Sequence, residues 1–188
     1  MTLVKAAFLD RDGVINVDKG YVYKWEEFEF IPGYLEALKA LQENGYLLFI
    51  VTNQSGIARG IYTTEEYELL TNAMVNHLSI NGINISEVYH CPHLEGSPIE
   101  EYNVACDCRK PKPGLLIRAA TEWAIQLSES ILIGDKASDI AAAKSAGIGK
   151  MYRIKDVNDL STPQVGICYK NLIECVRNIL TENLSEGK

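Results

Sequence analysis

Residues 4–13, VKAAFLDRDG, decide the fold, because a short and mostly apolar run is followed directly by Asp10, Asp12 and Gly13. A brief apolar run that ends in polar residues is typical of a strand buried on both faces of a parallel sheet. Ligands of such sheets bind just beyond the carboxyl ends of the strands. We therefore predict a strand at residues 4–9 with functional carboxylates at its end.

Apolar runs alternate with amphipathic stretches along the rest of the chain. The predicted strands span residues 4–9, 46–51, 88–90, 131–133 and 150–154, and the predicted helices span residues 32–44, 63–81, 114–126, 138–147 and 172–180. Thr63 and Glu66 form a capping box for the second helix, Ser138 caps the fourth, and the polar tail after Leu180 is expected to fray. Strands separated by helices predict an α/β fold with a doubly wound, Rossmann-like parallel sheet.

Composition and charge narrow the class of protein. The 188 residues are 47% hydrophobic and 23% charged, which is ordinary for one globular domain, and we predict a single domain over residues 1–188. No apolar run reaches the roughly 20 residues of a membrane-spanning helix, and the start lacks a secretory pattern, which favours a cytoplasmic protein with no membrane partner. The net charge of −7 argues against nucleic acid as a partner. A small phosphorylated substrate would therefore need local cations or a metal.

Asp10 and Asp12 are two positions apart at the end of the first predicted strand, and Gly13 allows a sharp turn after them. One carboxylate can attack phosphorus and form an aspartyl phosphate. The other can donate a proton to the leaving alkoxide and later activate water. A surface turn is the alternative, because Asp-x-Asp-Gly is also common turn composition.

Polar residues also follow two later predicted strands. Residues 52–56, TNQSG, offer a hydroxyl and amides suited to a phosphoryl oxygen, although these residues also make ordinary turns. Asp135 emerges at the end of the run at 131–133, where it could supply oxygen to magnesium together with Asp10 and a backbone carbonyl. Asp139 is either a further ligand or a supporting acid in the first turn of a helix, and we favour the supporting role.

Residues 108–114, CRKPKPG, form the most basic stretch of this acidic chain. Prolines restrict its backbone, so its cations are held in place. A fixed lysine can neutralise a carboxylate nucleophile and the phosphate beside it. A solvated basic loop is the alternative.

Three of the five cysteines lie close together in the sequence, with a histidine among them. Cys91, His93, Cys106 and Cys108 form two short arms, and a set of three thiolates and one imidazole is typical of a closed structural zinc site. A disulfide or plain buried thiols are the alternatives. The loop, about residues 90–110, would then hold the adjacent basic stretch at the active site. We interpret His77 and His90 as structural, and Cys168 and Cys175 as buried thiols.

The four polar segments resemble, in order and spacing, the four motifs of the haloacid dehalogenase superfamily, over roughly residues 4–154. The resemblance implies Asp10 as the nucleophile, Asp12 as the general acid/base, and Thr52 and Lys110 as phosphoryl stabilisers. It implies Mg²⁺ as a catalytic cofactor, held by Asp10, the carbonyl of Asp12 and Asp135. The second aspartate favours a phosphatase over a dehalogenase, and the short segments between motifs leave no room for a large cap domain.

The cysteine loop narrows the resemblance to the branch of histidinol-phosphate and heptose-bisphosphate phosphatases. Three features favour the heptose enzymes: residues 10–22, residues 53–60 and the long spacer between His93 and Cys106. The match implies a small phosphorylated sugar as substrate, with contacts from Asp18, Lys19, Gly20, Tyr21, Thr52, Asn53, Gln54, Ser55, Arg109, Lys110 and Lys136. Arg109 could hold a second phosphate that is not cleaved.

Three other functions remain open at this point. A histidinol-phosphate phosphatase would share the mechanism and both metals. A phosphotransferase would pass the same aspartyl phosphate to an alcohol. A zinc-stabilised binding module without activity would be expected to have lost a catalytic group, yet every motif residue is present. By analogy with capless relatives we expect a monomer.

Overall fold

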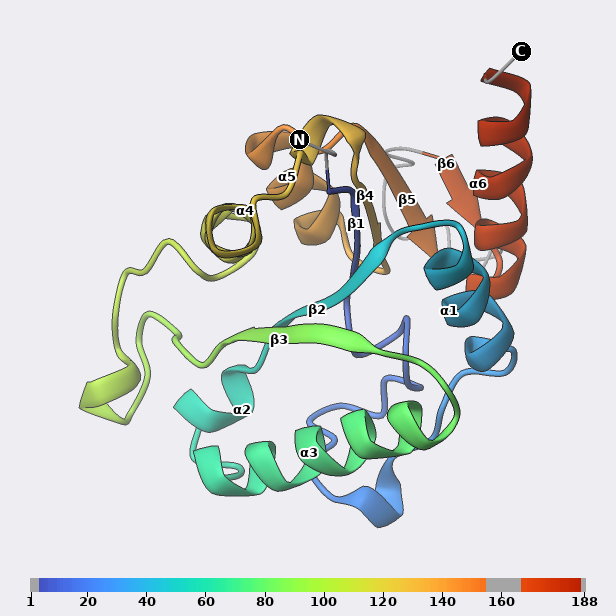
Figure 1. Cartoon of the computed structure of the whole chain (residues 1–188). Helices are drawn as coiled ribbons and strands as arrows, with labels where there is room; N and C mark the ends of the chain where they lie inside the picture. Colours follow the sequence, from blue (N-terminus) through green and yellow to red (C-terminus); the bar gives the residue numbers. More distant parts are fainter. Residues whose placement is uncertain (1–3, 155–166, 187–188) are drawn as a thin grey trace.

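The computed structural model describes residues 4–154 and 167–186, and a six-stranded sheet lies at its centre (Figure 1). All neighbouring strands are parallel. Their order across the sheet is β3-β2-β1-β4-β5-β6, and their bounds are β1 Ala6–Leu9, β2 Leu47–Asn53, β3 Ile85–Cys91, β4 Ile131–Gly134, β5 Lys150–Ile154 and β6 Ile167–Tyr169. The predicted parallel sheet is confirmed.

Helices cover both faces of this sheet, and their bounds are α1 Tyr34–Glu43, α2 Ser55–Ala58, α3 Thr64–Ile80, α4 Gly114–Trp123, α5 Ala137–Ala146 and α6 Leu172–Glu186. One core joins α1, α3 and α6 to one face, and a second joins α4 and α5 to the other. Figure 1 shows α1 and α6 across the sheet from α4 and α5. In β1, Ala7 and Leu9 enter the first core while Ala6 and Phe8 enter the second, as the period of two requires. The doubly wound arrangement is therefore confirmed.

Several predicted boundaries are confirmed and others are wrong for local reasons. The capping box of α3 is present, with the Glu66 N–H donating to Thr63 Oγ1 at 3.2 Å and the Thr63 N–H donating to Glu66 Oε2 at 2.8 Å. Ser138 is not the cap of α5, because Lys136 occupies that position and its N–H donates to Asp139 Oδ2 at 2.8 Å. The carboxylate in the first turn thus sets the start of the helix.

The two helices predicted over 114–126 and 172–180 end elsewhere. α4 stops at Trp123, because Ile125 turns inward, is 8% exposed and forms a bridge with Val4 at the end of the sheet. α6 continues past Leu180 to Glu186, so the predicted end of this helix is wrong. The Tyr152 hydroxyl donates to Glu182 at 3.1 Å and holds the added turn against β5.

Sequence reasoning missed β6, α2 and three short 3-10 helices at Trp25–Glu27, Glu100–Tyr102 and Leu127–Glu129, and β3 is longer than predicted. β6 is a three-residue edge strand, and α2 is a four-residue helix inside a segment expected to be a loop. Cys175 is fully buried as predicted, but Cys168 on β6 is only half-buried, because an edge strand has one uncovered side. His77 is structural: it bonds the Tyr34 hydroxyl at 2.7 Å and stacks on an aromatic cluster.

The connectivity places the end of β1 at a switch in strand order. From β1 the chain builds β2 and β3 on one side and then crosses to β4, β5 and β6 on the other. No separate cap domain is present among the described residues; the long excursions at this edge are residues 10–33 and 92–113. The carboxyl ends of β1 and β4 therefore open toward loops, at the position where such sheets bind ligands.

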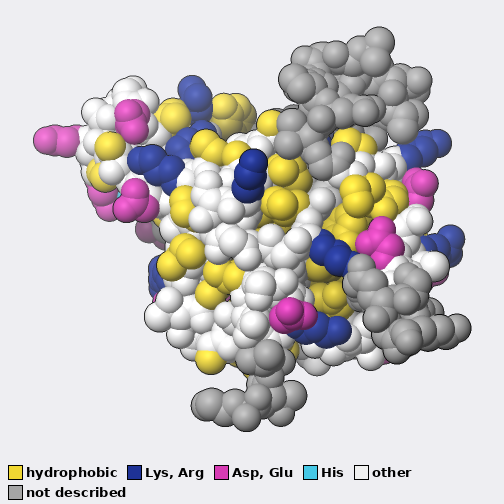
Figure 2. All heavy atoms as spheres, turned by 90° about the horizontal axis from the view of Figure 1, so that it is seen from above, with side chains coloured by type: hydrophobic (Ala, Val, Ile, Leu, Met, Phe, Trp, Pro, Cys, Tyr) yellow, Lys and Arg dark blue, Asp and Glu magenta, His cyan; other side chains and the backbone are white. Residues whose placement is uncertain are grey.

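The face of the molecule seen from above carries mixed charge. Figure 2 shows acidic side chains gathered on the lobe at the left and basic side chains spread among apolar groups, without a continuous basic area on that face. None of the helices in residues 4–154 and 167–186 is long and apolar enough to cross a bilayer.

Candidate active site

Asp10 begins the first loop after β1, and its N–H continues the sheet by donating to the Ile133 carbonyl at 3.0 Å. Gly13 follows with φ of +88°, a conformation that glycine adopts without strain. A Cβ at Gly13 would lie 2.5 Å from Asp135 Oδ2, closer than real side chains come. The absent side chain therefore allows the loop after β1 and the loop after β4 to bring their carboxylates together.

Lys110 reaches this point from the basic stretch and is 4% exposed. Its Nζ lies 3.0 Å from Asp10 Oδ1 and 2.6 Å from Asp139 Oδ1, and it donates to the Val51 carbonyl at 2.7 Å. Burial alone would lower the pKa of Lys110, but the charges of Asp10 and Asp139 outweigh burial and raise it. Lys110 is therefore a fixed cation beside the proposed nucleophile.

The acidic residues at this edge match the requirements of a hard divalent cation. One oxygen from each of Asp10, Asp135 and Asp139 lies within 4.8 Å of the others. Asp135 Oδ1 is buried and accepts no hydrogen bond from the described part of the chain. Burial and then the charge of Asp10 raise the pKa of Asp135 to about 7, and burial also raises the pKa of Asp10. Crowded carboxylates with an unused oxygen fit a magnesium ion.

Asp139 has partners for both of its oxygens. Oδ1 pairs with Lys110, and Oδ2 accepts the N–H of Lys136 at the start of α5. The side chain is 1% exposed, less than those of the other two acids. These contacts favour a supporting role for Asp139 over direct ligation.

Asp12 lies beside this cluster and is held by three side chains. Arg11 Nη2 donates to its two oxygens at 3.0 and 2.9 Å, Asn16 Nδ2 donates to Oδ1 at 3.0 Å, and Gln54 Nε2 donates to Oδ2 at 3.1 Å. Arg11 is itself 1% exposed and is anchored on the Val22 carbonyl at 2.9 Å. Sequence reasoning missed Arg11, because the sequence does not show in which direction the side chain of an arginine between two motif aspartates points.

Thr52 and Asn53 end β2 and point to different partners. Thr52 Oγ1 accepts from Gln54 Nε2 at 2.9 Å and is buried. The Asn53 amide bonds the backbone of Lys110 twice, donating to its carbonyl and accepting its N–H, both at 3.0 Å. Asn53 thus holds the basic stretch in register with β2, in addition to facing the cavity described next.

A cavity of about 680 Å³ opens above these groups. The residues that line it are Asp12, Asp18, Gly20, Tyr21, Asn53, Gln54, Ser55, Arg59, Tyr62, Arg109, Lys110, Pro111, Lys136 and Ser138. Most of the predicted substrate contacts are therefore brought together. Thr52 lies buried behind Gln54, and Lys19 points away, since its Nζ pairs with Glu29 at 2.8 Å.

Four lining residues were not among the predicted substrate contacts: Arg59, Tyr62, Pro111 and Ser138. Arg59 belongs to residues 53–60, which resemble the heptose enzymes, and Tyr62 lies two residues beyond that segment. The positions of their side chains depend on the turn after α2, which no local pattern predicts.

The cations of the cavity fall into two groups. Lys110 pairs with Asp10 and Asp139, and Lys136 Nζ lies 3.1 Å from Asp18 and 3.7 Å from Asp135. Arg59 and Arg109 form no ion pair with a carboxylate among the described residues. The two arginines are therefore available to a second anionic group, away from the reacting carboxylates.

The predicted zinc ligands converge beside the cavity. Their sulfur atoms are 2.9 Å apart for Cys91 and Cys108, 3.2 Å for Cys106 and Cys108, and 3.6 Å for Cys91 and Cys106. His93 Nδ1 lies 3.2 Å from Cys108 Sγ. These separations exceed a disulfide bond of about 2.05 Å, and the cysteines are free. Three thiols and an imidazole gathered around one point fit a tetrahedral zinc ion.

The cysteine cluster is linked directly to the basic stretch. Arg109 follows Cys108 and donates to the His93 carbonyl at 3.3 Å, and Lys112 Nζ donates to the Cys106 carbonyl at 2.7 Å. Between the two arms, Ser97 Oγ donates to the Ala58 carbonyl at 2.6 Å. The loop is thereby attached to the helices at the cavity and holds Arg109 at its rim.

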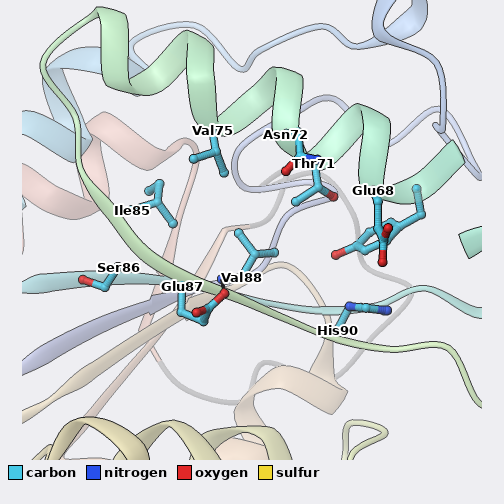
Figure 3. A pocket seen from close by; sticks show the side chains of 10 residues that line it. Glu68, Thr71, Asn72, Val75, Ile85, Ser86, Glu87, Val88 and His90 are labelled. Carbon is cyan, nitrogen blue, oxygen red and sulfur yellow. Dashed lines mark hydrogen bonds between the residues drawn. The ribbon is translucent and has the colours of Figure 1, made fainter. Parts of the chain in front are cut away.

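A second cavity, of about 370 Å³, lies between α3 and β3 (Figure 3). Glu68 and Glu87 are among its lining residues, and no lysine or arginine lines it. His90 also lines it, but burial lowers the pKa of His90 to about 4, so its ring is neutral at pH 7. The ring lies 4.3 Å from that of Tyr67, which supports the structural interpretation of His90. A phosphate ester would be repelled here.

Comparison with known proteins agrees with this site. The model of the haloacid dehalogenase-like hydrolase family matches residues 4–147. The chain is 50% identical to the D-glycero-beta-D-manno-heptose-1,7-bisphosphate 7-phosphatase of Vibrio cholerae over 80% of this chain and 81% of that one. It is 47% identical to the D-glycero-alpha-D-manno-heptose-1,7-bisphosphate 7-phosphatase of Campylobacter jejuni over 81% of this chain and 83% of that one.

The fold has a close counterpart among solved structures. The D,D-heptose 1,7-bisphosphate phosphatase of B. bronchiseptica, solved with magnesium and phosphate, superposes with a TM-score of 0.81 at 28% identity, covering 95% of this chain and 99% of that one. The family match spans all four polar segments, from the loop after β1 to α5. The chain belongs to the haloacid dehalogenase-like hydrolases.

Proposed function

We propose that this protein is a magnesium-dependent phosphatase that removes the C7 phosphate of D-glycero-D-manno-heptose 1,7-bisphosphate. The observation that carries the proposal is the buried group in which Lys110 Nζ lies 3.0 Å from Asp10 and 2.6 Å from Asp139, at the floor of a cavity lined with further cations. The names of relatives at 50% and 47% identity support the same substrate.

The reaction divides between two carboxylates. Asp10 attacks phosphorus and the bond to the sugar oxygen breaks, giving an aspartyl phosphate, while Asp12 donates its proton to the leaving oxygen. Asp12 then removes a proton from water, which displaces Asp10 and releases phosphate. Lys110 and the hydroxyl of Thr52 stabilise the charge on the transferred group. The three donors around Asp12 support this role by keeping its carboxylate in one place.

The acidic cluster is proposed to hold Mg²⁺ through Asp10, the Asp12 carbonyl and Asp135. When bound, the ion neutralises these carboxylates and polarises a phosphoryl oxygen. Cys91, His93, Cys106 and Cys108 are proposed to hold a structural Zn²⁺. Its contribution would be to order a polar loop that has little core of its own and to keep Arg109 at the cavity.

A bisphosphate explains the surplus of positive charge. The C7 phosphate, which is removed, would lie beside Lys110. The phosphate on C1 needs cations at a distance from the acids. Arg59 and Arg109 line the same cavity without a carboxylate partner among the described residues. We propose that they hold the C1 phosphate, and that Asp18, Gly20, Tyr21, Ser55 and Lys136 surround the sugar between the two ends.

The relatives carry the names of both C1 anomers at similar identity, 50% for a beta and 47% for an alpha enzyme. Either product, a heptose 1-phosphate, would supply nucleotide-heptose synthesis for lipopolysaccharide or another surface glycan. We propose a cytoplasmic monomer with a single phosphatase domain over residues 1–188. A reducing compartment would keep the thiols of the zinc site available.

The test is phosphate release by the purified protein with Mg²⁺, from each anomer of heptose 1,7-bisphosphate and from histidinol phosphate. We expect turnover of a heptose bisphosphate with strong preference for one anomer. Preference for histidinol phosphate would replace the substrate but keep the mechanism, and transfer to an added alcohol in preference to water would indicate a phosphotransferase. Absence of magnesium-dependent release across a sugar-phosphate panel would favour a binding module.

A further inference from the structure

Tyr62 lies between α2 and α3, next to the cavity but outside every motif used above. It is 4% exposed, and its ring stacks on Tyr23 with centroids 5.2 Å apart. A Cβ at Gly56 would lie 2.1 Å from the Tyr62 ring and 2.7 Å from its hydroxyl. The close approach therefore requires glycine at that position and holds the Tyr62 hydroxyl at one point.

That hydroxyl makes a short hydrogen bond to Gln54. Tyr62 donates to Gln54 Oε1 at 2.6 Å, and both side chains are buried, with Gln54 only 2% exposed. Burial raises the pKa of the Tyr62 hydroxyl, so it remains protonated and acts as the donor. The carbonyl end of the Gln54 amide is thereby fixed toward Tyr62.

The opposite end of the same amide faces the reacting groups. Gln54 Nε2 donates to Asp12 Oδ2 at 3.1 Å and to Thr52 Oγ1 at 2.9 Å. If the amide turned over, its oxygen would face the Asp12 carboxylate and repel it. The Tyr62 bond opposes this, because a donor needs the carbonyl oxygen and not the NH₂ group.

Both contacts of Gln54 affect the proposed chemistry. Asp12 gains a third donor that fixes one of its oxygens. Thr52 uses a lone pair of its hydroxyl to accept from Gln54, so its own hydrogen is left to point toward a phosphoryl oxygen. One amide orientation thus places the acid/base and a phosphoryl donor together.

We propose that Tyr62 is a positioning residue for phosphoryl transfer: through Gln54 it holds Asp12 and Thr52 in their reactive orientations. The inference rests on the proposed phosphatase function. It predicts that the Tyr62 hydroxyl contributes to kcat without contacting the atoms that react, and that its whole effect passes through Gln54.

A double-mutant cycle on full-length protein with Mg²⁺ and heptose bisphosphate tests this inference. Tyr62→Phe removes one oxygen and keeps the ring. We expect kcat to fall about 10-fold or more, within the range for misplaced acid–base groups, while KM changes less than about 3-fold. Gln54→Leu should lower kcat at least as much. The double variant should match Gln54→Leu within about 2-fold, because residues acting as one unit are not additive.

Tyr67→Phe is the matched control, since Tyr67 is a neighbouring tyrosine, 2% exposed, whose hydroxyl makes no hydrogen bond to Gln54, Asp12 or Thr52. Its kcat should stay within about 2-fold of wild type. The inference is overturned if Tyr62→Phe keeps the wild-type kcat, if Tyr67→Phe loses as much, or if the two losses multiply in the double variant. If Tyr62→Phe does not fold, Gln54→Leu alone decides the test. An unchanged kcat of Gln54→Leu would refute positioning through Gln54. Inactive wild-type protein would instead refute the proposed function.

Discussion

At the scale of single residues, Asp10 and Lys110 form the contact on which the mechanism depends. Two oppositely charged groups are almost fully buried 3.0 Å apart, where desolvation is costly unless each has its partner. By itself, such a buried ion pair is weak evidence that it stabilises the fold. Its place at the end of β1, under a cavity lined by cations, makes a catalytic use the better explanation.

Asp10→Asn keeps the shape of the side chain and removes its nucleophilicity. We expect kcat to fall by about a thousandfold or more with the melting temperature little changed, as measured by phosphate release and thermal unfolding. Glu43→Gln, an exposed acid at the end of α1, is the control for loss of one charge and should remain fully active. More than a trace of turnover by Asp10→Asn would exclude Asp10 as the nucleophile.

Arg59→Ala and Arg109→Ala test the second phosphate site. Each variant should lower kcat/KM on heptose 1,7-bisphosphate by about 10- to 100-fold, the range expected for a lost charged hydrogen bond. On heptose 7-phosphate, which lacks the C1 phosphate, the same variants should behave almost as wild type. Arg118→Ala, whose guanidinium pairs with Glu122 on α4, controls for loss of a surface arginine. Equal losses on both substrates would contradict the assignment.

At the scale of elements, the loop between β3 and α4 connects the cysteine cluster to the active site. Arg109 and Lys112 bond backbone carbonyls within the loop, and Ser97 joins the loop to Ala58 on α2. Gly114 at the start of α4 lies against the loop, where a Cβ would be 2.4 Å from the Asp107 carbonyl. Disorder in the loop would therefore reach the first turn of α4 and the cations beside it.

Cys106→Ser should remove one thiolate from the proposed zinc site. We expect zinc content, measured by atomic emission, to fall well below one ion per chain and the melting temperature to drop by several degrees. KM should rise because Arg109 loses its support. Cys168→Ser, a half-buried thiol on β6, is the matched control and should keep its metal. A Cys106→Ser protein with full zinc and unchanged stability would refute the structural zinc site.

At the scale of the whole molecule, two halves of the sheet contribute one carboxylate loop each. β1 supplies Asp10, β4 supplies Asp135, and their oxygens meet only because the strands are adjacent and parallel. Burial raises the pKa of both acids, and the charge of Asp10 raises the pKa of Asp135 further, so a cation binding here should stabilise the fold as well as the reaction.

Magnesium should therefore raise the melting temperature of the wild-type protein. At about 100 times its Kd, a ligand that binds only the folded state adds about 2.7 kcal/mol, which corresponds to several degrees for a chain of this size. Asp135→Asn should lose most of this shift, and potassium chloride of equal ionic strength should not reproduce it. A shift of the same size in Asp135→Asn would place the ion elsewhere.

The order of the elements and most motif residues were predictable from the chain alone. Strands buried on both faces appear in the sequence as apolar runs. The polar residues that follow parallel strands lie at the same edge of the sheet, so Asp10, Thr52 and Asp135 could be placed near each other. The cysteine set was predictable because ligand types and spacing are written in the sequence.

The tertiary structure decided what these patterns leave open. The end of α4 depends on Ile125 packing against the sheet, and the extra turns of α6 depend on a contact with Tyr152, both made across long sequence separations. Lys19 faces a neighbouring acid and not the cavity, although it lies inside a predicted contact segment. Tyr62 and Arg59 reach the site through the turn after α2. Local composition determines which groups exist and where strands end, whereas the direction of each side chain follows from packing between distant segments, which no window of sequence contains.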